Sequence, residues 1–330
     1  MPATRRTLRL ELEHWNYKSP FRITGHVWTA IEVLTVTLAE DGAFGRGEAA
    51  GVHYLGDNLQ TMIAQIEAVR SCIEAGADRS AVQALLPPGG ARNAIDCALW
   101  DLDAKISDVP AWRLAGLDAP RPLITTFTCG ADSPQKMAQA AVTHKGAKAL
   151  KLKLTGDPAD ADRVRSVRDA RPDVSILVDA NQGFTLASLE RLMPVFTAAR
   201  VELIEQPFPI GQDSLLDKFE SPIPIAADES VQSGSDIAGL VGRFDVINIK
   251  LDKCGGLTEA LAMARTAHSL GLEAMVGTMG GTSLAMAPGH LVGQLCRIVD
   301  LDGPILLKRD REPSFDYGSG ELQCPAGLWG

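Results

Sequence analysis

Short apolar runs alternate with longer polar stretches of helical character over the last two-thirds of the chain. This alternation predicts strands and helices in turn, and strands joined by helices form parallel βα units. Eight such strands with seven intervals between them predict a closed β/α barrel. The predicted strands cover residues 123–127, 149–152, 175–178, 201–204, 223–227, 246–249, 273–276 and 297–299. An open doubly wound sheet is the alternative, and it is disfavoured because no glycine-rich phosphate turn follows the first strand.

The first third of the chain has a different pattern. Residues 7–14 and 31–38 alternate or run apolar as strands do, and Asp41-Gly42 supplies a hairpin signal after the second. Helical patterns follow at 59–75 and 92–106, with a Pro-Pro-Gly-Gly breaker between them. We therefore expect an antiparallel sheet followed by helices.

These patterns divide the chain into three parts. An α+β unit covers residues 1–120, the barrel covers 121–305, and a tail covers 306–330. Prolines and glycines interrupt the tail, which is expected to pack back on the first unit.

Composition and charge exclude several classes of function. The 330 residues are 45% apolar and 22% charged, which is ordinary for a globular protein. A net charge of −9 argues against binding to nucleic acid or to an anionic membrane, both of which attract basic surfaces. No apolar stretch has membrane-spanning or signal-peptide character. The six cysteines form no C-x-x-C pair, so neither a zinc knuckle nor a disulfide framework is indicated. We expect a reduced, cytoplasmic protein and leave a homo-oligomer open.

Charged residues follow the apolar core of six of the eight predicted strands. A single charged residue at the end of a strand is usually exposed to water. Charged residues at the same position of six strands indicate a functional site, because the loops at the carboxyl ends of barrel strands build the active site. The residues concerned are Lys151 and Lys153, Asp179, Glu205, Asp228, Lys250, and Asp300 and Asp302.

Asp179, Glu205 and Asp228 end three consecutive predicted strands. Their mutual repulsion in a partly dry site would be severe unless a cation neutralised it. Hard oxygen ligands favour Mg²⁺, with Mn²⁺ as a substitute, and argue against zinc. We expect one such ion per subunit.

Lysines stand on the strands that flank these carboxylates. Lys153 and Lys250 would face a substrate over the metal from opposite sides, an arrangement that suits inversion by two bases. A free lysine has a pKa of about 10.4, whereas a useful base lies near 7–8. The like-charged neighbour Lys151 and the metal are expected to lower the pKa toward that range.

At these residues the sequence resembles the enolase superfamily, in its muconate-lactonising subgroup, along essentially the whole chain. The order of Lys151, Lys153, Asp179, Glu205, Asp228 and Lys250 matches the base, the three metal ligands and the second base of that subgroup. The helix at 94–102 resembles the stretch that precedes the barrel. The resemblance implies a (β/α)₇β barrel, a modified TIM barrel of the α/β class, under an α+β capping domain completed by the tail.

Asp300-Leu301-Asp302 resembles the Asp-x-Asp of the dipeptide epimerases, in which two carboxylates receive the free ammonium of the N-terminal residue. Two residues apart on a strand, both carboxylates point the same way and can share one ammonium. The alternative interpretation is that the two carboxylates simply lie at a strand end exposed to solvent.

Weaker signals lie in the loops. Arg22 is expected to hold a substrate side-chain carboxylate, as in epimerases for Ala-Glu, with an exposed cap arginine as the alternative. The loop at 51–57 is expected at the barrel mouth without an assigned contact. The segment 278–282 departs from the bulkier, acidic sequence of some Ala-Glu epimerases. Asn181 and Glu229 are expected as partners of the metal ligands.

The sequence therefore predicts a Mg²⁺-dependent dipeptide epimerase, an isomerase similar to the L-Ala-D/L-Glu epimerases. Two lysines would invert the α-carbon of the C-terminal residue through a metal-stabilised enolate. Within the subgroup, an N-acylamino-acid racemase, an o-succinylbenzoate synthase or a muconate cycloisomerase is the alternative, and none of these needs an ammonium site. A Schiff-base lysine aldolase is an alternative from another class. A non-catalytic binding protein is disfavoured, because it has no use for two opposed lysines.

Overall fold

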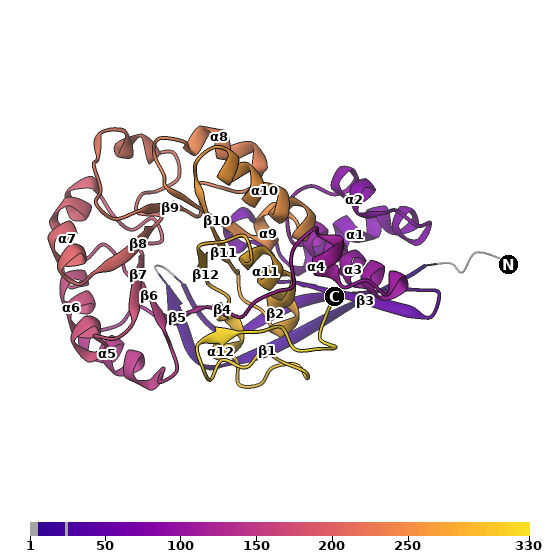
Figure 1. Cartoon of the computed structure of the whole chain (residues 1–330), viewed down its shortest axis with the longest axis horizontal. Coiled ribbons are helices and arrows are strands. Elements are labelled where there is room, and N and C mark those ends of the chain that lie inside the picture. The colour runs from indigo at the N-terminus through magenta and orange to yellow at the C-terminus, as the bar shows by residue number, and fades with distance from the viewer. Residues whose placement is uncertain (1–5, 24–25) are drawn as a thin grey trace.

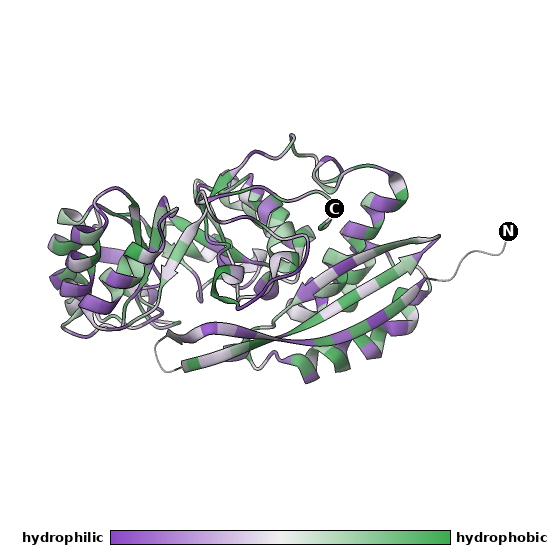
Figure 2. Cartoon of the chain, turned by 90° about the horizontal axis from the view of Figure 1, so that it is seen from below, coloured by the Kyte–Doolittle hydropathy of each residue, from purple (hydrophilic) through white to green (hydrophobic). Residues whose placement is uncertain are grey.

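An antiparallel sheet of three long strands opens the fold. The computed structural model describes residues 6–23 and 26–330, but not the side chains of residues 21–23 and 26. The strands β1 (Thr7–Ile23), β2 (His26–Glu40) and β3 (Ala43–Ala49) lie in the order β1-β2-β3. The predicted hairpin between β2 and β3 is confirmed, since Asp41 and Gly42 both have positive φ angles, of 52° and 80°. Figure 2 shows the sheet as a twisted ribbon with helices on one side.

The first two strands run further than the sequence predicted. A register shift between Asn16 and Phe21 interrupts the pairing of β1 with β2, so the apolar alternation that marks a strand is lost there. The tail supports this extension, because Lys308 donates its backbone N–H to Asn16 and Tyr17 forms a bridge with Leu307.

Three helices cover one face of this sheet: α1 (Leu59–Glu74), α2 (Arg79–Leu85) and α3 (Gly90–Ser107). The first and last match the predicted helices to within two residues, whereas α2 was not predicted. The side chain of Asp78 caps α2 by accepting the N–H of Ala81. A Cβ on Gly47 would lie 2.1 Å from the carbonyl oxygen of Ala94, so this glycine lets α3 approach β3 closely.

Eight parallel strands form the second sheet, in the order β12-β11-β10-β9-β8-β7-β6-β5 (Figure 1). They are β5 (Thr126–Cys129), β6 (Ala149–Lys153), β7 (Ser175–Asp179), β8 (Val201–Glu205), β9 (Ile225–Ala227), β10 (Val246–Lys250), β11 (Glu273–Gly277) and β12 (Ile298–Val299). The predicted barrel architecture is confirmed.

Helices or short helical turns connect these strands in sequence. In chain order they are α5 (Pro134–Thr143), α6 (Asp160–Ala170), α7 (Leu186–Ala198), η2 (Asp213–Lys218), η3 (Gly234–Asp236) with α8 (Ile237–Leu240), α9 (Leu251–Cys254) with α10 (Leu257–Ser269), and α11 (Ser283–Gly293). The connection between β8 and β9 has only the 3-10 turn η2, so the helix of that repeat is reduced to a single short element.

The first predicted barrel strand was placed wrongly. The apolar run 123–127 belongs to two elements, because β4 (Leu123–Ile124) pairs antiparallel with β13 (Glu321–Leu322) of the tail. The barrel strand proper is β5, which begins at Thr126. One continuous run of residues can therefore contain two short strands that pair with different strands.

The barrel closes through side chains between its first and last strands. Among the described residues, no backbone ladder joins β5 to β12. Instead the hydroxyl of Thr126 bonds Asp300, the N–H of Thr128 donates to Asp302 at 2.6 Å, and the N–H of Leu301 donates to the hydroxyl of Thr125. Asp300 and Asp302 thus lie at the seam of the barrel.

The last residues of the chain contact the N-terminal unit. The indole N–H of Trp329 donates to the carbonyl of Arg46 in β3 at 2.9 Å and to that of Cys97 in α3 at 3.2 Å. Where the barrel passes into the tail, the short helix α12 (Gly303–Leu306) contacts β1. A short helix α4 (Ala111–Leu114) lies beside the chain end, where Ala111 donates its N–H to Gly330 (Figure 1). No helix among the described residues is both long and apolar enough to cross a membrane.

Candidate active site

A small apolar cluster forms the floor beneath the site. Its buried members come from five neighbouring barrel strands: Leu177, Leu203, Ala226, Val246 and Met275. Side chains two residues further along a strand share its face, which places Asp179, Glu205, Asp228, Asn248 and Gly277 directly above this floor. On this face of each strand, an apolar side chain is therefore followed two residues later by one in the layer of the site.

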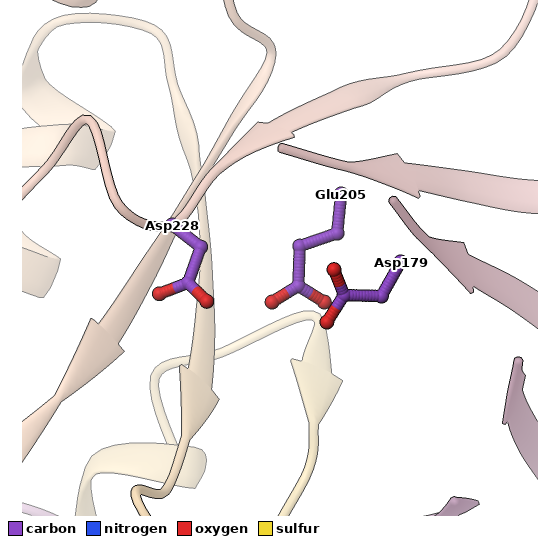
Figure 3. Close-up of side chains that lie close together, drawn as sticks. All are labelled: Asp179, Glu205 and Asp228. Atoms are coloured by element: carbon purple, nitrogen blue, oxygen red, sulfur yellow. The ribbon is translucent and has the colours of Figure 1, made fainter. Parts of the chain in front are cut away.

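Three carboxylates meet in this polar layer. One oxygen from each of Asp179, Glu205 and Asp228 lies within 4.8 Å of the other two, and all three residues are buried. Figure 3 shows the carboxylates pointing toward one another. Three hard oxygen donors at this spacing fit a divalent cation such as Mg²⁺. Glu205 Oε2 supports this fit, because it accepts no hydrogen bond from the described residues, although Lys151 Nζ lies 2.8 Å away.

Charges within the cluster set the protonation of these carboxyl groups. Burial, with Asp179 nearby, raises the pKa of Glu205 to about 8. Burial also acts to raise the pKa of Asp179, but Lys153 and Lys151 outweigh it and lower that pKa to about 2. The group that most needs a cation in order to ionise is thus Glu205, the middle carboxylate.

The three predicted lysines surround the carboxylates. Lys153 Nζ lies 2.5 Å from Asp179 at one end of the cluster, and Lys250 Nζ lies 2.6 Å from Asp228 at the other. Lys151 is fully buried between them, with Asp179, Glu205 and Asp300 all within 3.1 Å of its Nζ. The structure therefore brings together the lysines and carboxylates that the sequence singled out.

The protein's own charges act on Lys250 in both directions: Lys151 lowers its pKa, as the sequence predicted, and Asp228 raises it. Burial acts to lower this pKa, but the adjacent carboxylate of Asp228 outweighs burial and raises it above the ordinary value. A cation that neutralised the charge of Asp228 would lower the pKa of Lys250 toward the range of a useful base.

Two residues of the cluster were missed in the sequence. Lys253 Nζ donates to the carboxylate of Asp228 at 2.7 Å and to its main-chain carbonyl at 2.5 Å. Asn248 Nδ2 donates to Glu205 Oε1 at 2.8 Å. Asn248 could have been found from its spacing, because it precedes Lys250 by two residues on the same strand face.

Asp300 and Asp302 lie at the edge of the same cavity. The Oδ2 of Asp300 accepts from Lys151 at 2.7 Å, and its Oδ1 bonds Thr126. Burial and the neighbouring Asp300 raise the pKa of Asp302 to about 6. Both predicted carboxylates line the cavity, and Asp300 already has a cationic partner, whereas Asp302 pairs with no cationic side chain among the described residues.

A cavity of about 480 Å³ lies between the barrel and the cap. Cap residues line it opposite the carboxylates, among them Tyr17, Trp28, Ile31, His53 and Tyr54. The last two come from the loop at 51–57, as expected, in the turn η1 (His53–Leu55).

The remaining predicted residues have varied placements. Asn181 and Glu229 line the cavity, but Asn181 contacts Asp179 through its backbone N–H rather than its side chain. Asn181 Oδ1 and Glu229 Oε2 are buried and accept no hydrogen bond from the described residues. Thr278, Met279 and Gly280 also line the cavity. The backbone of Arg22 pairs with Val27, and its side chain lies outside the part of the chain that the structure describes.

Two family models match the chain. The model for the N-terminal domain of mandelate racemase and muconate lactonizing enzyme matches residues 5–116. The model for enolase C-terminal domain-like sequences matches residues 135–312. Together they cover the antiparallel cap and the barrel from α5 onward.

Curated relatives are similar to the chain over most of its length. An L-Ala-D/L-Glu epimerase from Escherichia coli K12 is 38% identical over 96% of this chain and 99% of its own. An N-acetyl-D-glutamate racemase from a Pseudoalteromonas species is 37% identical over 90% of this chain and 95% of its own. Epimerases and racemases of this kind are isomerases that act on amino-acid derivatives.

Solved structures share the fold. An enolase family member from Agrobacterium tumefaciens with homology to dipeptide epimerases, bound to sodium and L-Ala-L-Glu, superimposes with a TM-score of 0.95 at 41% identity, over 98% of this chain and 100% of its own. A dipeptide epimerase from Methylococcus capsulatus, in complex with Mg and L-Arg-D-Lys, does so with a TM-score of 0.91 at 30% identity, over 99% of both chains.

Proposed function

Because the chain belongs to the mandelate racemase and muconate lactonizing enzyme family of the enolase superfamily, we propose that it is a Mg²⁺-dependent dipeptide epimerase. It would invert the α-carbon of the C-terminal residue of a dipeptide. The observation that carries the proposal is the placement of Lys153 and Lys250 at opposite ends of one buried carboxylate cluster, in a cavity that also contains Asp302.

Asp179, Glu205 and Asp228 would hold one Mg²⁺ per subunit, and Mn²⁺ would be accepted as a substitute. A divalent cation there supplies positive charge that makes the α-proton of a bound carboxylate more acidic. Asn181 and Glu229 support the proposal as nearby partners, because both residues line the cavity and each has a buried oxygen that accepts no hydrogen bond from the described residues.

The two end lysines would move the proton. One lysine, as a neutral amine, takes the α-proton from one face and becomes an ammonium. The other, as an ammonium, delivers a proton to the opposite face, so the substrate is inverted without net gain or loss of protons. Lys151 would remain charged, because three carboxylates around its Nζ outweigh burial and keep its pKa above the ordinary value.

Substrate selection would depend on the seam and the cap. Asp302, with Asp300 beside it, would balance the free ammonium of the dipeptide, and Arg22 would serve a side-chain carboxylate. We further propose that the chain is organised as a cap of residues 1–120, a barrel of 121–305 and a tail of 306–330. A cytoplasmic location fits its six free cysteines, and a homo-oligomer is compatible with the fold.

An N-acylamino-acid racemase is the second candidate. The similarity to an N-acetyl-D-glutamate racemase favours it, because that substrate has no free ammonium. The seam carboxylates separate the two candidates, since only a free dipeptide needs them.

Hydrogen exchange at the α-carbon in D₂O tests the proposal. A library of free dipeptides and the matching N-acetyl amino acids would be incubated with enzyme and Mg²⁺, and with enzyme treated with EDTA. Exchange and inversion of free dipeptides that need Mg²⁺ are expected. Faster turnover of the N-acetyl series would select the racemase instead, and full activity after chelation would remove the metal from the proposal.

Substitutions of the three proposed metal ligands test the metal in the same experiment. Asp179→Asn, Glu205→Gln and Asp228→Asn keep the shape of each side chain and remove its charge. Each should weaken Mg²⁺ binding and reduce turnover by about 10² or more, since charge stabilisation by the metal would be lost. A variant with normal turnover and normal metal affinity would exclude that residue as a ligand.

A further inference from the structure

Two lysines contact the same carboxylate in different ways. Lys250 reaches Asp228 Oδ2 and lines the cavity. Lys253 reaches Asp228 Oδ1 from the short helix α9 and is not among the described residues that line the cavity. Its side chain is only 1% exposed, and it also holds the main-chain carbonyl of Asp228. Lys253 therefore fixes one oxygen of Asp228 from behind, away from the substrate.

The same pattern occurs at the other two carboxylates. Asp179 Oδ1 accepts the backbone N–H of Asn181 at 2.8 Å, and Glu205 Oε1 accepts Asn248 Nδ2 at 2.8 Å. The opposite oxygen of each faces a lysine: Asp179 Oδ2 faces Lys153 and Glu205 Oε2 faces Lys151. In each of the three carboxylates, one oxygen is tied to the protein and the other is directed into the cluster.

This pattern bears on which cation the cluster selects. Mg²⁺ requires near-ideal octahedral geometry and binds through few carboxylate oxygens, whereas Ca²⁺ accepts more ligands and often takes both oxygens of a carboxylate. A donor that holds one oxygen of a carboxylate fixes the orientation of the group, which directs the other oxygen into the cluster and disfavours binding of a cation through both oxygens. Three such carboxylates give three single-oxygen ligands, a number that suits Mg²⁺ and falls short for Ca²⁺.

We propose that Lys253 and Asn248 are positioning residues that keep Asp228 and Glu205 as single-oxygen ligands and so select Mg²⁺ over Ca²⁺. This inference rests on the proposed function, because it assumes that the three carboxylates bind a divalent cation. It assigns Lys253 a role distinct from that of Lys250, although both contact Asp228.

Calorimetric titration with Mg²⁺ and with Ca²⁺ tests the inference without measuring activity. Lys253→Met frees Asp228 Oδ1, and Asn248→Ala frees Glu205 Oε1 without changing any charge. Each should shift the ratio of the two affinities toward Ca²⁺ by about tenfold or more, because Ca²⁺ gains a ligand oxygen that Mg²⁺ does not use. Lys253→Arg, which keeps donors beside Asp228, should restore a ratio close to the wild-type value.

The outcomes are distinguishable. Lys105→Met is the matched control, because Lys105 pairs with Asp101 in the cap and should leave the ratio unchanged. A wild-type protein that binds neither cation would contradict the proposed function itself. Wild-type Mg²⁺ binding with an unchanged ratio in Asn248→Ala and in folded Lys253→Met would overturn only the selection role. If Lys253→Met does not fold, as judged by thermal melting, Asn248→Ala decides the question, because it removes only a neutral side chain.

Discussion

At the scale of single residues, the period of the strands places reactive groups directly above apolar ones. Leu177 and Asp179, or Val246 and Asn248, share a face because side chains alternate along a strand. Inserting one residue into such a strand would move its carboxylate to the helix side. The two end lysines are therefore fixed in orientation by their strands, and their separate roles can be tested one at a time.

Replacing one end lysine should separate exchange from inversion. Lys250→Ala should reduce epimerisation by about 10²-fold or more, yet leave Lys153 able to exchange the α-proton of one epimer. Lys153→Ala should leave exchange only in the other epimer. Proton NMR in D₂O on each pure epimer measures both rates. Either variant interconverting both epimers at the normal rate would contradict one lysine per face.

The raised pKa of Asp302 predicts a pH dependence of substrate choice. Below pH of about 6 its carboxyl group is protonated and cannot balance an ammonium, and above that pH it is ionised. The ratio of kcat/KM for a free dipeptide to that for its N-acetyl analogue should therefore rise with pH through about 6, by about ten- to a hundredfold.

Taking this ratio removes titrations that both substrates share, such as those of the lysines. Measurements should stay below pH of about 7, since the substrate α-amino group loses its own proton near pH 7.7–8.0. In Asp302→Asn the ratio should be low and flat across the range. A rise that persists in this variant would assign the dependence to another group.

At the scale of elements, Arg311 joins the tail, the cap and a barrel loop. Its guanidinium donates to Glu48 of β3 at 2.7 Å, to Glu13 of β1 at 2.8 Å and to the hydroxyl of Thr282 at 2.7 Å. Glu48 is fully buried and also accepts the N–H of Thr282, which follows the cavity-lining segment 278–280. The cap thereby holds a loop that borders the site.

Removing this guanidinium should destabilise the fold strongly. Arg311→Met leaves Glu48 as a buried, uncompensated charge, which costs about 3–5 kcal/mol in comparable buried pairs. Arg243→Met is the matched control, because its pair with Asp217 is exposed on the surface and should contribute about 0–1 kcal/mol. Urea unfolding compares the two. Equal effects of both substitutions would show that the buried network does not stabilise the junction.

The sequence predicted the elements that have strict local patterns. Strand period and strand-end charge located seven of the eight barrel strands and brought Lys151, Lys153, Asp179, Glu205, Asp228 and Lys250 to one cluster. Features that depend on distant partners were not predictable. The split of the run at 123–127 follows from pairing with the tail, and the contact of Lys253 in α9 with Asp228 at the end of β9 joins segments 25 residues apart.

At the scale of the whole molecule, the cavity exists only because cap and barrel are held together. Its lining combines cap residues such as Trp28 with barrel residues such as Lys250. The tail contacts this junction at two places, through Arg311 and, further along, through Trp329, which bonds a cap residue and belongs to an apolar cluster that also contains barrel residues. Contacts of Trp329 with Arg46 and Cys97 span more than 200 residues of sequence, so no local pattern predicts them.

Trp329 should therefore contribute to the stability of the entire fold rather than of the tail alone. Trp329→Ala removes a buried aromatic ring and should cost about 3–5 kcal/mol, whereas Trp329→Phe keeps most of the packing. The phenylalanine variant loses only the two hydrogen bonds and should cost about 1–3 kcal/mol.

Ile210→Ala is the control, since that side chain is largely exposed and its loss should change little. Substrate at about 100 times its dissociation constant, added to protein that already holds Mg²⁺, should stabilise the fold by a further ~2.7 kcal/mol, because a ligand held between cap and barrel stabilises both together. Urea unfolding followed by tryptophan fluorescence and by circular dichroism should then show one shared transition for each variant. A separate early transition in Trp329→Ala, with the midpoint of the main transition unchanged, would mean that the tail folds independently of the junction.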